Sequence, residues 1–436
     1  MKHALILKML AGATLALTVA SSPAIARDHH GGSGDKDSQQ TAYPNATRKE
    51  PSNLAVKDEK EQKAVNDGLA ALQAGDNAKA LQLLQPIADS SDSSKYAQSL
   101  ALQGIANAKF KSGDTKGAID ALKRSLDIGM LPNDAYFDLE LELAQFYLSA
   151  EQFQPAIDTV EKYLADGKRE TSQAYAVEGN AYYRLQKYPE AIAALKKAQQ
   201  LNAGKPDPFV DQTLLAAYSD SGQSGQAAEL AQQQLANNPN DKAALSNAVA
   251  ALAQSGKLTE AIALEEKSRA AGGFDKQDDY LNLAKLYYQK AQQDSDPKAA
   301  AQKAVAVLEE GLSKGVVKPG YDVYNIMANA AYQGEDNNKA VDAFRKAIPF
   351  APNGDVAIAA GSLLLNEGKY SEAANLFQQG IDKGVKKKGS AYMKLAEAKR
   401  GMKDKAGAIA AMKIAAQDPD TAAKAKAWLK QAGAGK

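Results

Sequence analysis

A small residue followed by a large aliphatic one recurs along the chain at intervals of 33 to 43 residues. Ten alanines mark this repeat: Ala80, Ala118, Ala156, Ala191, Ala227, Ala261, Ala304, Ala340, Ala373 and Ala408. Eight of them are followed directly by Leu, Ile or Val. Self-similarity at this period is typical of a solenoid of helical hairpins, in which each unit buries its apolar face against its neighbours.

Residues 172–203 show the pattern of one unit most clearly. Tyr175, Gly179 and Tyr182 stand at helical spacing, and a second periodic run begins at Ala191. Pro189 falls in the first turn of that second run, where a helix does not need the missing N–H. The unit is therefore predicted to be two amphipathic helices of about 14 residues joined by a short turn.

Two further positions recur at a constant sequence spacing from the repeat alanine. Twelve residues before it most units carry Gly or Ala, and four residues after it most carry a large apolar residue. The small residues are predicted to let the two helices of a hairpin approach closely. The units around Ala227 and Ala261 depart from this pattern, with Ala231 and Glu265 in place of the large apolar residue. In the next unit, residues 292–297 are predicted to form a turn between two extended helices.

These positions resemble those of the tetratricopeptide repeat family. The resemblance is closest in residues 175–198 and 324–352, and it covers roughly residues 60 to 420. It implies an all-α fold, a right-handed superhelical solenoid of about ten antiparallel helix–turn–helix hairpins with a C-terminal capping helix. It also implies a role in binding and assembly, and it does not select one partner because the fold serves many.

The two ends of the chain carry different patterns. Residues 1–26 have a positive start, a short apolar run and the small-x-small sequence Ala24-Ile25-Ala26, which together are typical of a secretory signal peptide. We expect cleavage after Ala26, with an uncleaved anchor as the alternative. We also expect a periplasmic location in a Gram-negative envelope and no transmembrane segment after cleavage.

Residues 27–52 are predicted to be a flexible linker, because they are rich in Gly, Ser, Pro and polar residues. Residues 53–419 form the predicted solenoid, and residues 420–436 the capping helix and tail, with Trp428 in the core of the cap.

The amino-acid composition excludes most kinds of catalytic and metal-binding site. The chain has no cysteine, and its three histidines all precede residue 31. Residues 53–436 therefore lack the side chains for Ser-His-Asp or Cys-His catalysis, and we expect no enzyme activity, no cofactor and no metal site. Acidic pairs such as Glu265–Glu266 and Glu309–Glu310 are predicted to be solvated helix surface rather than a glycosidase pair. The formal net charge of +1 argues against nucleic acid as a partner.

The predicted partner-binding surface is the concave stripe of the first helices, one and four residues beyond the small packing residue and beside it. These positions hold Asn107, Phe110, Gln145, Asn180, Tyr183, Arg184, Lys285, Tyr288, Asn325, Asn329 and Tyr332. An Asn amide can both donate and accept hydrogen bonds to a peptide backbone, and an aromatic ring one turn away adds flat apolar area.

Two functions follow from this surface. The first is a non-enzymatic scaffold that binds a protein or peptide partner, in envelope assembly or export. The alternative is a glycan-binding solenoid that assists polysaccharide export, with sugar rings stacked on Tyr183, Tyr288 and Tyr332.

Overall fold

The computed structural model describes residues 41–203 and 205–434, and the secondary structure of these residues is helical without strands. The chain divides into two compact units, the first ending at Leu230 and the second beginning at Ala231. Helix α11, Ser224–Asn237, runs through the boundary. The predicted signal peptide, residues 1–26, lies outside the described residues.

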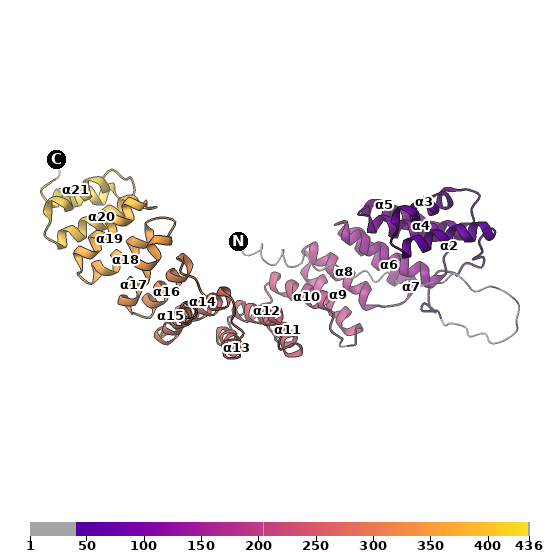
Figure 1. Cartoon of the computed structure of the whole chain (residues 1–436), viewed down its shortest axis with the longest axis horizontal. Coiled ribbons are helices and arrows are strands. Elements are labelled where there is room, and N and C mark those ends of the chain that lie inside the picture. Colours follow the sequence, from indigo (N-terminus) through magenta and orange to yellow (C-terminus); the bar gives the residue numbers. More distant parts are fainter. Residues whose placement is uncertain (1–40, 204, 435–436) are drawn as a thin grey trace. The chain divides into compact units, whose positions relative to one another are not determined.

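Unit 1 is built from successive helical hairpins (Figure 1). In order, its helices are α2 (Glu59–Gln73), α3 (Asn77–Asp89), α4 (Lys95–Lys111), α5 (Thr115–Ile128), α6 (Asn133–Ser149), α7 (Phe153–Gly167), α8 (Ser172–Arg184), α9 (Tyr188–Leu201) and α10 (Pro208–Asp220). The two helices of each hairpin contact one another, and each hairpin contacts the next. The first helices also meet directly, since α2 contacts α4 and α8 contacts both α6 and α10.

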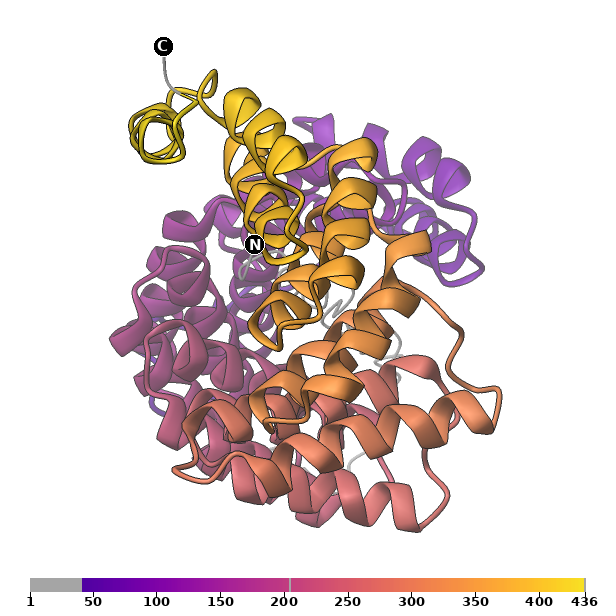
Figure 2. The same ribbon diagram turned by 90° about the vertical axis from the view of Figure 1, so that its left-hand side faces the viewer.

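Unit 2 repeats this arrangement. Its helices are α12 (Lys242–Gln254), α13 (Leu258–Ala270), α14 (Gln277–Gln293), α15 (Lys298–Ser313), α16 (Tyr321–Gln333), α17 (Asn337–Ala347), α18 (Asp355–Asn366), α19 (Tyr370–Lys383), α20 (Lys388–Gly401), α21 (Lys405–Ala415) and α22 (Ala422–Gln431), with a short 3-10 turn at Ile348–Phe350. Helices α18 to α21, orange to yellow in Figures 1 and 2, lie side by side in chain order. The expectation of consecutive helix pairs is confirmed, and so is the turn between the long helices α14 and α15.

The repeat alanines form the buried seam of every hairpin, because each of the ten is at most 1 % exposed. The position twelve residues earlier is small because the large side chain four residues after the alanine lies on it. A Cβ atom added to Gly179 would stand 2.6 Å from Leu195 Cγ, and one added to Gly68 would stand 2.5 Å from Leu84 Cγ. The two helices approach closely, as predicted, because a large side chain of the second helix packs directly on the backbone of the first.

Aspartates fix where several second helices begin. Asp76, Asp114, Asp336 and Asp404 each precede the first residue of a helix, and each side chain accepts a hydrogen bond from the backbone N–H three residues later. Such a cap satisfies an N–H group that has no partner within the helix, and it stabilises the helix by about 1 kcal/mol.

The prediction of a flexible linker over residues 27–52 is wrong for residues 41–50, which we call the N-terminal strap. Tyr43 is only 3 % exposed, and its ring packs 4.7 Å from that of Phe137 on α6. The Tyr43 hydroxyl lies 3.1 Å from that of Tyr163 on α7 and donates to Asp138 at 3.3 Å. Composition alone missed the strap, because one buried aromatic residue anchors an otherwise polar segment.

Polar contacts hold the rest of the strap. Thr41 Oγ1 and the Ala42 N–H both donate to Asp134 Oδ1, at 2.6 and 3.0 Å. Arg48 donates to Asn133 Oδ1 and to the Gly129 carbonyl, and its guanidinium lies 4.2 Å from the centre of the Tyr136 ring. The strap therefore joins residues about 80 to 120 positions apart, whereas the contacts of the hairpins are mainly between sequence neighbours.

The last helix, α22, covers the final hairpin as predicted. Its residues Ala425 and Leu429 are buried, and the helix contacts α21. Trp428 is the exception, because it is only half-buried and lies at the edge of the cap rather than in its core.

Candidate functional site

The predicted binding residues fall into two groups, one in each unit. Unit 1 holds Asn107 and Phe110 on α4, Gln145 on α6, and Asn180, Tyr183 and Arg184 on α8. Unit 2 holds Lys285 and Tyr288 on α14, and Asn325, Asn329 and Tyr332 on α16. The two groups have different surroundings and are described separately.

The amide side chains of the unit 1 group are buried. Asn107, Gln145 and Asn180 are 5, 6 and 7 % exposed. The expectation that they line an exposed stripe is therefore wrong. Neighbouring first helices pack against each other in this unit, so the position after the small packing residue lies between helices.

The aromatic residues of the unit 1 group serve internal packing. The Phe110 ring stacks on that of Phe146, with centroids 4.2 Å apart and planes within 7°. Tyr183 is 7 % exposed and donates from its hydroxyl to Asp220 Oδ2 at 2.9 Å. Burial and this hydrogen bond raise the pKa of Tyr183. The predicted exposure of Tyr183 is wrong, because α10 supplies both cover and a hydrogen-bond acceptor.

Arg184 is exposed, and it is already engaged within unit 1. Its guanidinium donates to Glu151 at 3.1 Å and lies 4.8 Å from the centre of the Phe153 ring. This pair is exposed on both sides, so it stabilises the unit by less than about 1 kcal/mol.

The unit 2 group forms a more open surface, which we call the α14–α16 surface and define by Lys285, Tyr288, Asn325, Asn329 and Tyr332. Tyr332 is 55 % exposed, more than any other large apolar side chain of the described residues. Lys285 is exposed, and Tyr288, Asn325 and Asn329 are half-buried. Helices α14 and α16 contact one another, so the two sets of residues lie on neighbouring elements.

An amide pair holds the geometry of this surface. The Asn329 side-chain nitrogen donates to the Asn325 carbonyl at 2.7 Å and to the Asn325 side-chain oxygen at 3.1 Å. One residue fixes the other one turn away on α16, so the orientation of both amides is set before any ligand arrives. The remaining donor and acceptor capacity suits a peptide backbone, and Tyr332 offers an unoccupied apolar face.

A buried acidic group on α6 was not predicted. Burial raises the pKa of Glu142 to about 7, while a hydrogen bond from Asn107 lowers it. Glu142 Oε1 and the neighbouring Gln145 Nε2 have no hydrogen-bond partner among the described residues. Glu140, 2 % exposed, is paired with Lys162. A single helix rich in Glu is normally solvated, and only the packing of α4 and α7 against α6 buries these side chains.

In unit 2 the prediction of solvated acidic pairs is wrong for Glu265, while Glu309 is exposed as predicted. Glu265 is 9 % exposed, and burial, with Asp279 nearby, raises its pKa to about 7. Glu266 and Glu310 both bind Arg269, at 2.6 and 2.5 Å. The pair of Arg269 and Glu310 links α13 to α15, so Glu266 and Glu310 serve a structural ion-pair cluster. No group of three or more His, Cys, Asp or Glu side chains in the described residues is arranged to hold a metal ion.

The sequence matches the model of one family of repeat proteins. The sequence model of the tetratricopeptide repeat family matches residues 141–206, 216–276 and 358–423. No curated protein matches the sequence. Within the part of the chain that the structure describes, none of the helices has the length and apolar character needed to cross a membrane.

Solved structures similar to this chain are also helical repeat proteins. A tetratricopeptide repeat protein from Parabacteroides merdae ATCC 43184 is 13 % identical with a TM-score of 0.39, over 70 % of this chain and 98 % of that one. MamA from Desulfovibrio magneticus RS-1 is 19 % identical with a TM-score of 0.36, over 42 % of this chain and 99 % of its own. The pentatricopeptide repeat protein PPR10 from maize is 17 % identical with a TM-score of 0.43, over 86 % of this chain and 54 % of its own.

Proposed function

Because this chain is a tetratricopeptide repeat protein, we propose that it is a scaffold that binds a segment of a partner protein on the α14–α16 surface. The observation that carries the proposal is the exposed ring of Tyr332 next to the fixed amide pair of Asn325 and Asn329. Tyr, Trp and Arg are the residue types that most often dominate the affinity of protein interfaces.

The partner segment on this surface is an extended peptide or one face of a helix. The Asn side chains hydrogen-bond to its backbone, Tyr332 and Tyr288 pack on an apolar side chain, and exposed Lys285 favours a nearby acidic residue. Attraction to Lys285 is between exposed charges, so it weakens as the salt concentration rises.

Of the two functions predicted from the sequence, glycan binding has less support from the surface residues. It requires several exposed aromatic rings, and Tyr183 is taken up by packing in unit 1. Tyr288 and Tyr332 remain for a sugar ring. A glycan would bind them without the salt dependence expected for a charged peptide.

The location we propose is the periplasm of a Gram-negative bacterium, where the partner would be a component of envelope assembly or export. The support is the pattern of residues 1–26 in the sequence. Mass spectrometry of the protein isolated from its native cells tests this part. A chain that begins at Arg27 supports the location, and a chain that retains residues 1–26 in the cytoplasmic fraction contradicts it.

Site-specific photo-crosslinking tests the binding surface. A photoreactive phenylalanine analogue is placed at Tyr332, and the cells are irradiated before lysis. The control places it at Tyr370, which is 38 % exposed but lies on the second helix of a hairpin. We expect a crosslinked protein at position 332 that is absent at position 370. Equal crosslinking at both positions, or none at 332, would argue against the α14–α16 surface.

Affinity capture of the identified partner then measures how much the Tyr332 ring contributes to binding. Tyr332→Ala is expected to weaken capture roughly tenfold or more, the effect of removing an interface anchor. The exposed ring has little structural role, so the circular dichroism spectrum should not change. Unchanged capture by this variant would mean that the partner binds a different surface.

A further inference from the structure

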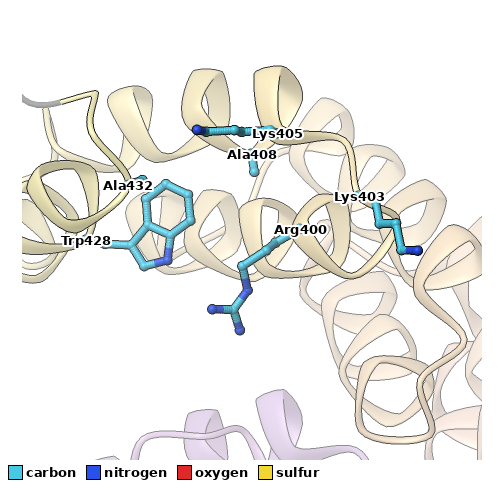
Figure 3. Close-up of a pocket in the computed structure, with 6 residues that line it drawn as sticks. All are labelled: Arg400, Lys403, Lys405, Ala408, Trp428 and Ala432. Carbon is cyan, nitrogen blue, oxygen red and sulfur yellow. The ribbon is translucent and has the colours of Figure 1, made fainter.

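A pocket lies at the C-terminal end of unit 2, away from the α14–α16 surface in the sequence. Its lining comes from α20, the turn that follows it, α21 and α22, and its volume is about 300 Å³. Six residues line it: Arg400, Lys403, Lys405, Ala408, Trp428 and Ala432 (Figure 3). A space of this size holds one ring with a short substituent.

The walls of the pocket are mainly apolar. The Trp428 indole forms one side, and the methyl groups of Ala408 and Ala432 contribute to the rest. Trp428 is the only tryptophan in the chain, and it is half-buried although a capping helix could use it as core. Its ring therefore offers a flat apolar face to a ligand of matching shape.

Cationic side chains surround this apolar wall. Arg400, Lys403 and Lys405 are exposed, and in the described part of the chain they form no ion pair. The nearest acid in the sequence, Asp404, already binds Lys399 at 3.2 Å and caps α21 through the Gly407 N–H. In Figure 3, Arg400 and Lys405 extend past opposite sides of the Trp428 ring, whereas Lys403 points away from it.

The surrounding elements strengthen this positive field. Residues 388–431 contain ten Lys or Arg and only four Asp or Glu, although the whole chain has a net charge of +1. A patch of one sign attracts ions of the opposite sign and raises their local concentration. Two unpaired cations beside an apolar wall thus favour a ligand that combines a negative group with a flat apolar body.

We propose that this pocket binds a small aromatic carboxylate, with its ring packed on Trp428 and its carboxylate held by Arg400. Arginine recognises a carboxylate through two parallel hydrogen bonds, and Lys405 on the other side of the ring adds to the positive field. The site is independent of the α14–α16 surface, so either can fail without the other. The carboxylate belongs either to a free small molecule or to the C-terminal aromatic residue of a peptide.

The single tryptophan makes the test direct, because the fluorescence of Trp428 reports on this pocket alone. The full chain is titrated with phenylacetate, with N-acetylphenylalanine, and with the uncharged phenylacetamide as the matched control. We expect a saturable change in fluorescence with one or both carboxylates, and binding of the amide at least roughly tenfold weaker because it lacks the charge-assisted hydrogen bonds. Binding of phenylacetate indicates a free small molecule, and binding of N-acetylphenylalanine alone indicates a peptide terminus.

Two variants distinguish binding by the pocket residues from a general effect of the positive charge of this region. Arg400→Gln is expected to weaken carboxylate binding roughly tenfold. Lys413→Gln removes the same charge from an exposed position that does not line the pocket, and it is expected to leave the affinity unchanged. The proposal is overturned if neither carboxylate gives a saturable change, if phenylacetamide binds as well as phenylacetate, or if both variants weaken binding equally.

Discussion

At the scale of the residue, the small packing position is set by the side chain that rests on it. Gly179 and Leu195 illustrate this, because they come from the two helices of one hairpin and leave no room for a methyl group between them. The same relation holds at Gly361, where an added Cβ atom would stand 2.8 Å from the Phe377 ring. A glycine is therefore retained inside these helices despite its low helix propensity.

A methyl group at this position should destabilise the fold. Gly179→Ala is expected to lower the free energy of unfolding by about 1–3 kcal/mol, since the added atom overpacks a closed site. Gly225→Ala is the matched control, because a Cβ atom there meets nothing within 4 Å and alanine is the better helix former. Urea denaturation of both variants checks this, and equal stability of the two would contradict the packing argument.

The buried Glu142 should make stability depend on pH. Its pKa of about 7 in the folded protein lies above the ordinary value of 4.5, so the folded state binds the proton more tightly than the unfolded state does. Stability from this group is complete below pH 4.5 and is lost as the pH rises from 4.5 to 7. Glu142→Gln keeps a neutral polar side chain at all pH values, and it should exceed the wild type in stability above pH 7 by roughly 2 kcal/mol.

Thermal unfolding from pH 4.5 to 8 measures this difference. Burial also raises the pKa of Glu178 and Glu265 to about 7, so a reduced slope should remain in the variant. Exposed Glu397→Gln serves as the control, and it should leave the pH profile unchanged. Identical profiles for Glu142→Gln and the wild type would mean that Glu142 is not buried in solution.

At the scale of the element, the N-terminal strap adds a long-range connection to a fold of local contacts. It spans the start of α6 and the end of α7, and it is anchored by one buried ring. Each hairpin of a repeat array is otherwise stabilised only by its own packing and its neighbours. The strap should therefore make the α6–α7 hairpin more stable than the hairpin pattern alone implies.

Removing the anchor tests the role of the strap. Tyr43→Ala deletes a buried ring against Phe137 and Tyr163, and it is expected to cost about 3–5 kcal/mol in unit 1. Tyr43→Phe keeps the ring and loses only the hydroxyl contacts, so it should cost about 1 kcal/mol. Hydrogen exchange should show lost protection at the start of α6 and at the end of α7. Unaltered exchange in Tyr43→Ala would mean that the strap does not hold this hairpin.

At the scale of the whole molecule, the chain consists of two compact units of similar helical hairpins. The strap connects hairpins within unit 1 only, and Trp428 lies at the end of unit 2. Contacts in both units are mainly between neighbours along the chain. Stability in such an array is a sum of local terms, so unfolding need not be a single transition.

The sole tryptophan allows this to be measured without labelling. In urea, the transition of Trp428 fluorescence is expected to differ in midpoint from the helical circular dichroism signal, which averages over both units. Tyr43→Ala should shift the circular dichroism transition and leave the Trp428 transition in place. Coincident transitions that shift together in the variant would show instead that the chain unfolds as one cooperative body.

The sequence by itself determined the repeat: its period, the buried alanines, the helix pairs, the long helices α14 and α15, and the capping helix. A solenoid can be read in this way because each hairpin packs against its nearest neighbours, so the pattern along the chain is the pattern of the core. Only the tertiary structure decided which side chains near that core stay accessible. Asn107 and Tyr183 are covered by helices of adjacent hairpins while Tyr332 is not, and the Glu142 carboxyl group is buried by neighbours that its own helix does not specify. Tyr43 and Trp428 were misjudged for the same physical reason, because burial depends on what packs against a residue from elsewhere in the chain.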